Sequence, residues 1–415
     1  MHAEDVPLPQ IAETVGTPVY VYSRATLERH AQVFTEALSG LDQPLIAFAV
    51  KSNPNLAVLN VLQKQGFGAD VVSGGELRRA LAAGIAPDKI VFSGVGKTRA
   101  ELELGLDEKI GQFNIESREE GHELAGIATA RGIEAQACLR INPDVDAKTH
   151  EKISTGKAEN KFGVPLLRAR ETFAELAALE GMNLRGVAIH IGSQLADLEP
   201  LETAFAKVGK LVEDLRAAGH TITHVDLGGG LGVPYRKGEV LPSPADYGAM
   251  VARATSGWDV KLAFEPGRVI AGNAGVMLTT ALYEKAAPDR SFLIVDAGMN
   301  DLMRPALYGA HHDITPLKQA APDAPVKTYD VVGPICESTD KFASGREMPA
   351  VAPGDRLAFM SAGAYGAVLS SAYNTRPLVP EVLVNGDRFD IVRRRPDLEE
   401  MLQLEQVPDW LKRTD

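Results

Sequence analysis

The sequence is poor in cysteine, because only Cys138 and Cys336 occur in 415 residues. Two cysteines cannot form the disulfide framework of a small secreted fold. No stretch approaches the roughly 18 uninterrupted apolar residues of a membrane span, and the N-terminal MHAEDVPLPQ lacks the apolar core of a signal peptide. These absences predict a reduced, cytoplasmic protein with no membrane association.

Basic residues are also fewer than acidic ones. The sequence has 43 Lys and Arg residues and 55 Asp and Glu residues, which gives a net charge of −12. This balance argues against nucleic acid or an anionic membrane as the main partner. Internal repeats and low-complexity segments are missing, and no metal site is expected. The length exceeds that of one ordinary domain, so we expect two.

Short apolar runs alternate with Ala-, Leu- and Glu-rich segments over the first part of the chain, which indicates βαβ units and a parallel sheet. Helical segments are expected at 55–65, 75–83, 118–131 and 201–218. The predicted strands are Leu45–Val50, Ala69–Val72, Ile90–Ser93, Phe113–Ile115, Ala135–Ile141, Gly186–Ile191, His224–Leu227 and Leu262–Glu265.

Eight such repeats in about 240 residues predict a closed (β/α)8 barrel, with an open doubly wound sheet as the alternative. Residues with useful chemistry recur at the carboxyl ends of the predicted strands, where barrel active sites lie. The long polar segment Asp144–Gly163 is typical of a mobile loop over such a site.

The helical alternation stops after Arg268, and turns rich in Gly, Pro and Asp then separate short strands. We therefore predict a barrel over residues 24–272 and an all-β domain over 273–415, joined by the strand-like segment 1–23. The strands expected in the second domain are Gly272–Leu282, Ser291–Asp296, Lys327–Val332, Asp355–Phe359 and Val382–Val384.

Lys51 follows the first predicted barrel strand in FAVKSNPN. Desolvation or a neighbouring cation would lower the pKa of its amine, and a neutral amine can attack a carbonyl. Glu265, in EPGR after the last strand, could hold a proton on a pyridine nitrogen. Each residue also has a purely structural alternative. Lys51 could be a surface lysine at a strand end, and Glu265 could form a buried ion pair with Arg268.

The glycine run in DLGGGLG follows the seventh strand, where barrels commonly bind phosphate, although an isolated GGG is as consistent with a simple turn. His190, at the end of the predicted sixth strand, could stack on a flat ring, and Ser193, just after that strand, could donate to a phosphate. A histidine buried in the core is the alternative for His190.

Cys336 follows Gly333-Pro334 and is expected on a loop of the second domain, where a thiol can donate a proton. Tyr365, in GAYG, could reach a phosphate from a turn. Each has a plain alternative as a packed side chain, and Cys138, inside a barrel strand, is expected to be only a small buried residue.

Ten motifs in order give the sequence a specific resemblance: FAVKSN, ADVVSGGE, LRINP, ISTGKAENKFG, HIGSQ, DLGGGLG, EPGR, MRPALY, CESTD and GAYG. From about residue 18 to 384 the chain is similar to the fold-type III pyridoxal-phosphate decarboxylases, and most closely to the bacterial diaminopimelate decarboxylases. The segment GAYGAVLSSAYN departs from the family pattern at Leu369 and Ala372, which affects only the fine shape of the pocket.

The resemblance implies an alanine racemase-like barrel, pyridoxal 5'-phosphate as cofactor and a homodimer with shared active sites. It implies three catalytic residues, Lys51 as the Schiff-base lysine, Cys336 as the proton donor and His190 stacked on the ring. The implied cofactor-binding set is Lys51, Asp70, Arg140, His190, Ser193, Gly228, Gly229, Gly230, Glu265, Gly267, Arg268 and Tyr365. The implied substrate-binding set is Arg268, Arg304, Tyr308, Glu337 and Tyr365.

The reaction so implied is decarboxylation of meso-2,6-diaminopimelate to L-lysine and carbon dioxide, the last step of bacterial lysine biosynthesis. Arg268 and Arg304 could clamp a distal carboxylate, whereas ornithine, lysine, arginine or carboxynorspermidine remain the alternative substrates. A non-catalytic cofactor carrier resembles only the barrel, so the CESTD and GAYG segments argue against it. An alanine racemase-like activity would need an arginine at the position of Glu265.

Overall fold

The computed structural model describes residues 1–147, 149–150, 153, 155–156, 160–286 and 290–412. The chain divides into two compact units. One is Arg24–Ala274, and the other combines Met1–Ser23 with Gly275–Asp415. The predicted boundary lay two residues earlier, between residues 272 and 273.

The first unit is a closed barrel of eight parallel strands, in which β12 pairs with β4 and β8 pairs with β10 to complete the ring. This arrangement confirms the predicted (β/α)8 class and excludes the open sheet. The strands are β4 (Leu45–Ala49), β5 (Gly68–Val71), β6 (Ile90–Phe92), β7 (Gln112–Ile115), β8 (Ala135–Asn142), β10 (Met182–Ala188), β11 (His224–Asp226) and β12 (Lys261–Phe264), and β9 (Val164–Pro165) extends the end of β8.

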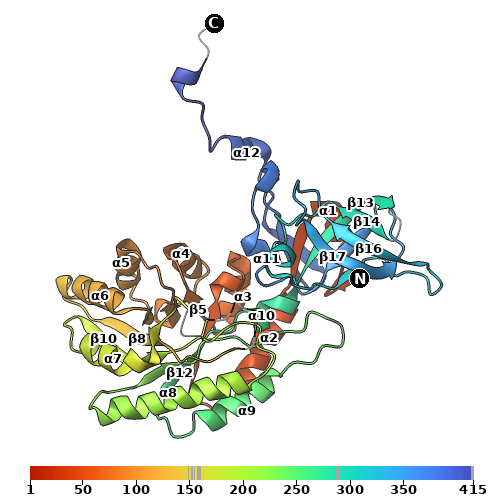
Figure 1. Cartoon of the computed structure of the whole chain (residues 1–415). Helices are drawn as coiled ribbons and strands as arrows, with labels where there is room; N and C mark the ends of the chain where they lie inside the picture. The colour runs from red at the N-terminus through yellow and green to blue at the C-terminus, as the bar shows by residue number, and fades with distance from the viewer. Residues whose placement is uncertain (148, 151–152, 154, 157–159, 287–289, 413–415) are drawn as a thin grey trace. The chain divides into compact units, whose positions relative to one another are not determined.

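Helices surround the barrel strands (Figure 1). They begin at caps that their sequences supply, as where Asn55, Ser73 and Ser117 each accept a hydrogen bond from a backbone N–H of the first turn. The helices are α2 (Arg24–Ala37), α3 (Leu56–Lys64), α4 (Gly74–Ala82), α5 (Arg99–Asp107), α6 (Arg118–Ala130), α7 (Ala169–Ala177), α8 (Glu199–Ala217), α9 (Pro244–Ala254) and α10 (Arg268–Ala271).

The second unit is built on a sheet in the order β17-β16-β14-β13-β3-β19-β20, with β18 and β15 paired beyond β13. The N-terminal strand β3 lies between β13 and β19, and its apolar residues Val19 and Val21 are buried in the core. The strands are β1 (His2–Ala3), β2 (Val6–Pro7), β3 (Val19–Ser23), β13 (Gly275–Ala286), β14 (Ser291–Val295), β15 (Ile314–Pro316), β16 (Val326–Val332), β17 (Lys341–Pro349), β18 (Arg356–Phe359), β19 (Glu381–Asn385) and β20 (Arg388–Arg393), with helices α1 (Leu8–Val15), α11 (Arg304–Tyr308) and α12 (Leu398–Leu402).

Three sequence predictions need correction at element ends. The first strand of the β unit begins at Gly275, because residues 272–274 form a 3-10 turn. Strand β10 ends at Ala188, so His190 lies on the following loop, and β8 continues one residue beyond its predicted end, to Asn142. A further strand, β17, was not predicted, because its sequence, KFASGREMP, is largely polar and four of its nine residues face solvent.

The predicted loop Asp144–Gly163 lies partly outside the described residues, and its mobility stays a prediction. Within the part that is described, the Val145 N–H donates to the Gly156 carbonyl at 2.8 Å and the Ser193 N–H to the Ile153 carbonyl at 3.1 Å. The first bond lies within the loop after β8, and the second connects that loop with the loop after β10. Across the described residues, no helix combines the length and apolar character needed to cross a membrane.

Candidate active site

Lys51 lies at the carboxyl end of β4 and forms an ion pair across to the next strand. Its Nζ is 2.5 Å from Oδ2 of Asp70, which is fully buried on β5, whereas the lysine side chain is 34% exposed. The other oxygen, Oδ1 of Asp70, is buried and has no hydrogen-bond partner among the described residues. A buried acceptor without a partner is costly, which indicates that this position receives a donor from outside the chain.

The residues after Lys51 hold its backbone in a short 3-10 turn, Val50–Ser52. Ser52 Oγ donates to the Ala49 carbonyl at 2.7 Å, and Asn53 Oδ1 accepts from the Asn55 N–H at 3.1 Å. Asn55 in turn caps α3. The SNPN sequence therefore fixes the direction in which Lys51 leaves the strand.

Glu265 follows β12, and its carboxyl group belongs to a buried network of polar side chains inside the barrel. Its Oε1 accepts from Ser93 Oγ at 3.2 Å and from Asn114 Nδ2 at 3.3 Å. Asn114 also donates to Asp226 Oδ2 at 3.0 Å, and Gln112 Nε2 donates to the same oxygen at 3.3 Å. Four strands thus supply one connected group of side chains.

Burial raises the pKa of Glu265 well above its usual value, and the nearby carboxylates of Asp226 and Asp70 raise it further, while Lys51 and Arg140 oppose the shift. Burial likewise raises the pKa of Asp226, which shares a hydrogen bond with Glu265. Two carboxyl groups this close cannot both ionise easily. The Asp226–Glu265 pair therefore holds a proton until a cationic group binds beside it.

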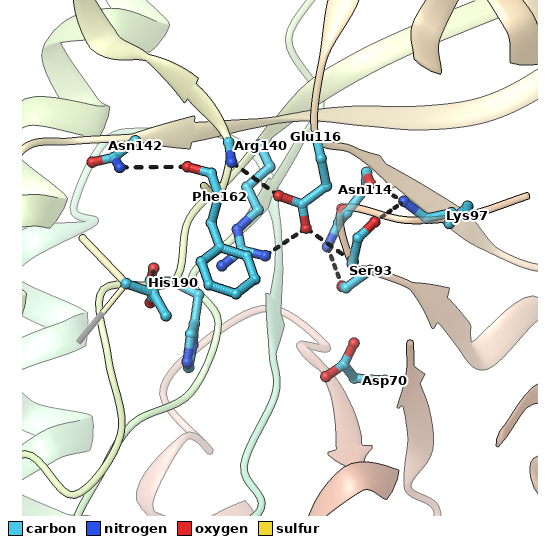
Figure 2. Close-up of polar contacts among 12 residues, drawn as sticks. Asp70, Ser93, Lys97, Asn114, Glu116, Arg140, Asn142, Phe162 and His190 are labelled. Atoms are coloured by element: carbon cyan, nitrogen blue, oxygen red, sulfur yellow. Dashed lines mark hydrogen bonds and ion pairs between the residues drawn. The ribbon is translucent and has the colours of Figure 1, made fainter. Parts of the chain in front are cut away.

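Arg140 is held by Glu116, which sequence reasoning did not identify. Figure 2 shows the Arg140 side chain running beside the Phe162 ring to the Glu116 carboxylate, and the charged atoms are 2.5 Å apart. The same carboxylate accepts from the N–H groups of Gly94 and Gly163, both at 2.9 Å. Glu116 thus ties three loops at the carboxyl ends of the strands to one side chain.

His190 lies on the loop after β10 with its imidazole directed at the glycine run. The N–H of Gly229 donates to His190 Nδ1 at 3.3 Å. Burial lowers the pKa of His190 well below its usual value, and the charges of Arg140 and Lys51 lower it further. The ring is therefore neutral at physiological pH, which suits packing against a flat cationic or aromatic group.

The glycine run needs glycine for close packing as well as for its backbone shape. Gly228 and Gly230 have φ values of +67° and +124°, which favour residues without a Cβ. A Cβ on Gly229 would lie 2.1 Å from the Glu265 carbonyl oxygen. The run therefore fits between the loops after β10 and β12, and a bulkier residue would push both apart.

Arg268 begins α10 beside this run. It donates to Tyr235 Oη at 2.6 Å and to Ser193 Oγ at 3.2 Å. Gly267, just before it, packs where a Cβ would come 3.0 Å from the Ala49 side chain. A hydroxyl, a guanidinium and the glycine backbone thus meet beyond the ends of β10, β11 and β12, where barrels bind phosphate.

These donors fit one kind of ligand. An amine beside a carboxylate with a vacant acceptor can take an aldehyde, and a protonated carboxyl pair can bind a basic ring nitrogen. The glycine run with Ser193 and Arg268 can hold a phosphate. A flat phosphorylated aldehyde with a pyridine-type nitrogen matches all three.

The comparisons with known proteins agree with this chemistry. The family described as "Pyridoxal-dependent decarboxylase, pyridoxal binding domain" matches residues 24–272. The diaminopimelate decarboxylase of Zymomonas mobilis is 49% identical over 411 residues, covering 98% of this chain and 97% of its own. This chain belongs to the diaminopimelate decarboxylase family.

Solved structures of the family share its fold. The diaminopimelate decarboxylase of Helicobacter pylori complexed with L-lysine has a TM-score of 0.91 and 41% identity, covering 96% of this chain and 98% of that one. The M. jannaschii enzyme in co-complex with L-lysine has a TM-score of 0.92 and 36% identity, covering 97% and 95% of the two chains. The chain is therefore a pyridoxal-dependent decarboxylase with the predicted barrel and an additional sheet.

The other predicted site residues belong to the β unit. Cys336 is exposed on the turn between β16 and β17, and Asn374 Oδ1 accepts its backbone N–H at 3.0 Å. Beside it, Glu337 Oε1 accepts from Thr339 Oγ1 at 2.5 Å. The buried Asp340 shapes this turn by accepting the N–H groups of Met299 and Ile335 at 2.7 and 2.6 Å. The CESTD segment is thus an ordered turn that presents Cys336 to solvent.

Arg304 and Tyr308 lie one turn apart on α11 and so share a side of that helix. Arg304 is buried and lies 2.8 Å from His312 Nε2, and His312 Nδ1 lies 2.8 Å from the Met360 carbonyl. Tyr365 lies on a turn with a φ of +55°, a strained value for tyrosine that commonly marks a functional position.

Sequence reasoning missed Glu116, Asp226 and Glu76 as members of the site. Burial raises the pKa of Glu76 to about 7, and the charge of Asp70 adds to the effect. Glu116 directly follows β7 as Lys51 follows β4, so its strand-end position was a usable signal. Asp226 stands at the start of the quoted DLGGGLG motif but was read only for its glycines.

Proposed function

We propose that this chain removes the carboxylate from one amino-acid centre of meso-2,6-diaminopimelate, giving L-lysine and carbon dioxide. Similarity to diaminopimelate decarboxylases along nearly the whole chain carries the proposal, and two of the solved relatives hold L-lysine, the product of this reaction. The barrel adds an independent argument, because its donors match pyridoxal 5'-phosphate.

In this proposal the barrel residues hold the cofactor at three points. Lys51 binds its aldehyde carbon, Glu265 its ring nitrogen, and the backbone of Gly228–Gly230 with Ser193 its phosphate. Asp70 keeps Lys51 in place through the 2.5 Å contact, and Arg140 and Gly267 support the surrounding loops. When bound, the cofactor supplies an electron sink for the pair released as carbon dioxide leaves.

The protein's own residues determine where protons and positive charge are held around the cofactor and the substrate. Glu265 holds a proton at the ring nitrogen, because the buried carboxyl pair stabilises a positive charge placed beside it. His190 stays neutral and packs on the ring face, adding no cation near the carboxylate that leaves. Cys336 returns a proton to the substrate Cα at the end of the reaction.

Recognition of the second amino-acid centre falls to the β unit. We assign its carboxylate to Arg304, with Tyr308 and Tyr365 assisting, and its amine to Glu337. Arg268 serves the phosphate end as well as the substrate. Ornithine and lysine lack this second carboxylate and could not make this contact with Arg304.

The proposal is tested by measuring carbon dioxide release from meso-diaminopimelate, ornithine, lysine and arginine with cofactor-saturated protein. We expect release from diaminopimelate with a kcat/KM at least about a hundredfold above the others. Equal or higher values for ornithine or arginine would overturn the substrate assignment, and no release from any of the four would favour a carrier.

Lys51 is expected to bind the cofactor covalently. Borohydride reduction of the cofactor-loaded protein should fix the label on the peptide that contains Lys51, because its amine leaves the strand end beside Asp70. The Lys51→Ala protein should show neither the label nor the visible absorbance, whereas Lys64→Ala, an exposed lysine on α3, should keep both. A label on another lysine would contradict the assignment.

Replacing Arg304 by methionine is expected to raise the KM for diaminopimelate roughly 10- to 100-fold, because hydrogen bonds to a charged group contribute about 1.5–3 kcal/mol each. Cofactor absorbance should not change. The exposed Arg388→Met variant on β20 is the control for loss of one positive charge. An unchanged KM would place the distal carboxylate elsewhere.

We also propose that the active unit is a homodimer in which each barrel site receives Cys336 and Glu337 from the partner subunit. The exposed Cys336 turn supports this arrangement, since a twofold dimer would exchange the same turn in both directions.

A further inference from the structure

A cavity of about 700 Å³ lies at the amino-terminal ends of the barrel strands. Its wall includes Leu45 at the start of β4, His224 at the start of β11 and Lys261 at the start of β12. The proposed active site lies at the opposite, carboxyl ends of the same strands. Nothing in the proposed decarboxylation uses this cavity.

The charge of the cavity is opposite to that of the chain. Lys89, Lys109, Arg185 and Lys261 line it, against one acidic residue, Asp88, in the described wall. The whole chain carries a net charge of −12. A concave, cationic surface on an acidic protein concentrates small anions and repels cations.

Arg185 shows that this is more than a rim of solvated lysines. Its guanidinium is half-buried and donates to the Gly111 carbonyl at 2.6 Å and to Gln136 Oε1 at 3.4 Å. Its Nε is buried and makes no hydrogen bond, and within the described parts of the chain no carboxylate offsets its charge. Burial lowers the pKa of Arg185, as expected for a cation without a counter-ion.

Two residues beside Arg185, His224 and Cys138, show that the positive charges of the cavity lie close together and are not neutralised. Burial lowers the pKa of His224 to about 4, and the charges of Arg185 and Lys261 contribute. The His224 ring is therefore neutral, with Nδ1 2.8 Å from Thr223 Oγ1. Cys138 also contacts Arg185, but burial raises the pKa of its thiol, so it supplies no negative charge.

We propose that this cavity binds a small phosphate-bearing anion. A guanidinium flanked by exposed lysine ammonium groups suits a tetrahedral, multiply charged group better than a single carboxylate. The volume lies in the range of small-molecule sites, so the phosphate can be free or part of a nucleotide-sized ester. This inference rests on the barrel alone and stands whatever substrate the active site takes.

The test uses cofactor-saturated protein, so that the phosphate site at the other end of the barrel is already filled. Isothermal titration calorimetry with inorganic pyrophosphate and with adenosine diphosphate compares the parent with Arg185→Gln and Lys261→Gln. Each substitution should weaken binding of both probes about tenfold or more. Arg388→Gln, which removes one positive charge from the exposed strand β20 and not from the cavity lining, should bind like the parent.

Tighter binding of adenosine diphosphate than of pyrophosphate would identify an ester as the ligand, and equal binding would identify phosphate alone. Equal affinity in parent, Arg185→Gln and Lys261→Gln proteins would overturn the proposal, as would the absence of binding at millimolar concentrations.

Nuclear magnetic resonance of labelled histidines provides a readout that does not depend on either substitution. A bound anion should raise the pKa of His224, because it offsets the charges of Arg185 and Lys261. The other histidines of the barrel should keep theirs. Probe binding that leaves the His224 pKa in place would locate the anion elsewhere and contradict the site.

Discussion

Replacing Glu265 by glutamine is expected to lower kcat for diaminopimelate by a factor on the order of 10²–10³, the size of effect seen when one preorganised electrostatic group is lost. The amide cannot hold a proton at the cofactor's ring nitrogen. In the proposed function the variant would then lack the residue that holds a proton on the bound cofactor, which would weaken the electron sink that the cofactor supplies.

The fold should tolerate this substitution. Glutamine has nearly the same shape as glutamate, and its carbonyl oxygen can accept from Ser93 and Asn114 as Glu265 Oε1 does at 3.2 and 3.3 Å. Its amide hydrogens can face Asp226, which then no longer shares a proton with a second carboxyl group. We therefore expect melting temperature and cofactor content close to those of the parent.

Single-turnover and steady-state rates, measured at matched cofactor occupancy, provide the test. The control is Glu108→Gln, which removes one negative charge from the exposed carboxyl end of α5. A Glu265→Gln enzyme within a few-fold of the parent kcat would show that another group holds the ring-nitrogen proton. A variant that loses the cofactor altogether would assign Glu265 to binding and not to turnover.

Most of the barrel was predictable from the sequence. Each of its eight strands is a short apolar run, and capped helices separate these runs at regular spacing along the chain. Phe48, Phe92 and Phe113 illustrate the signal, as each is fully buried on a strand. Their neighbours at the strand ends are polar, so the carboxyl edge could be located as well. The structure confirms the closed order of the strands.

The side-chain pairings were less predictable, since they depend on the register between strands. Arg140 meets Glu116 because β8 pairs with β7 so that Leu139 lies opposite Ile115. A shift of one residue would turn Arg140 to the other face. Strand-end chemistry is a local property of the sequence, whereas such a partner becomes evident only when the strands are assembled.

The β unit was harder to predict for a related reason. Its strand β3 comes from the N-terminus and pairs with β13 and β19, which are more than 250 residues away along the chain. The motif PVYVY identified β3 as a strand that joins the β domain, but the sequence did not indicate which strands it pairs with. The polar strand β17 gave no apolar alternation, so it was missed.

Mixing two inactive variants, Lys51→Ala and Cys336→Ala, is expected to restore activity towards a quarter of the parent level. If each site takes Lys51 from one chain and Cys336 from the other, a heterodimer places both lesions in one site and leaves the second intact. Random pairing of an equal mixture makes about half of the dimers heterodimers. Half of the sites in these heterodimers are then functional, so about a quarter of all sites in the mixture are active.

A second mixture supplies the matched control. Lys51→Ala and Glu265→Gln both alter the barrel, so every site in their heterodimer carries one of the two lesions and activity should stay at the level of the separate variants. Subunit exchange is verified by mass spectrometry of differently tagged chains. Recovery in the first mixture and not in the second requires that Cys336 act across the dimer, because only a residue supplied by the partner can complement a barrel lesion. Exchange without recovery in the first mixture would place Lys51 and Cys336 in the site of one chain, and the exposed Cys336 turn would then serve its own barrel.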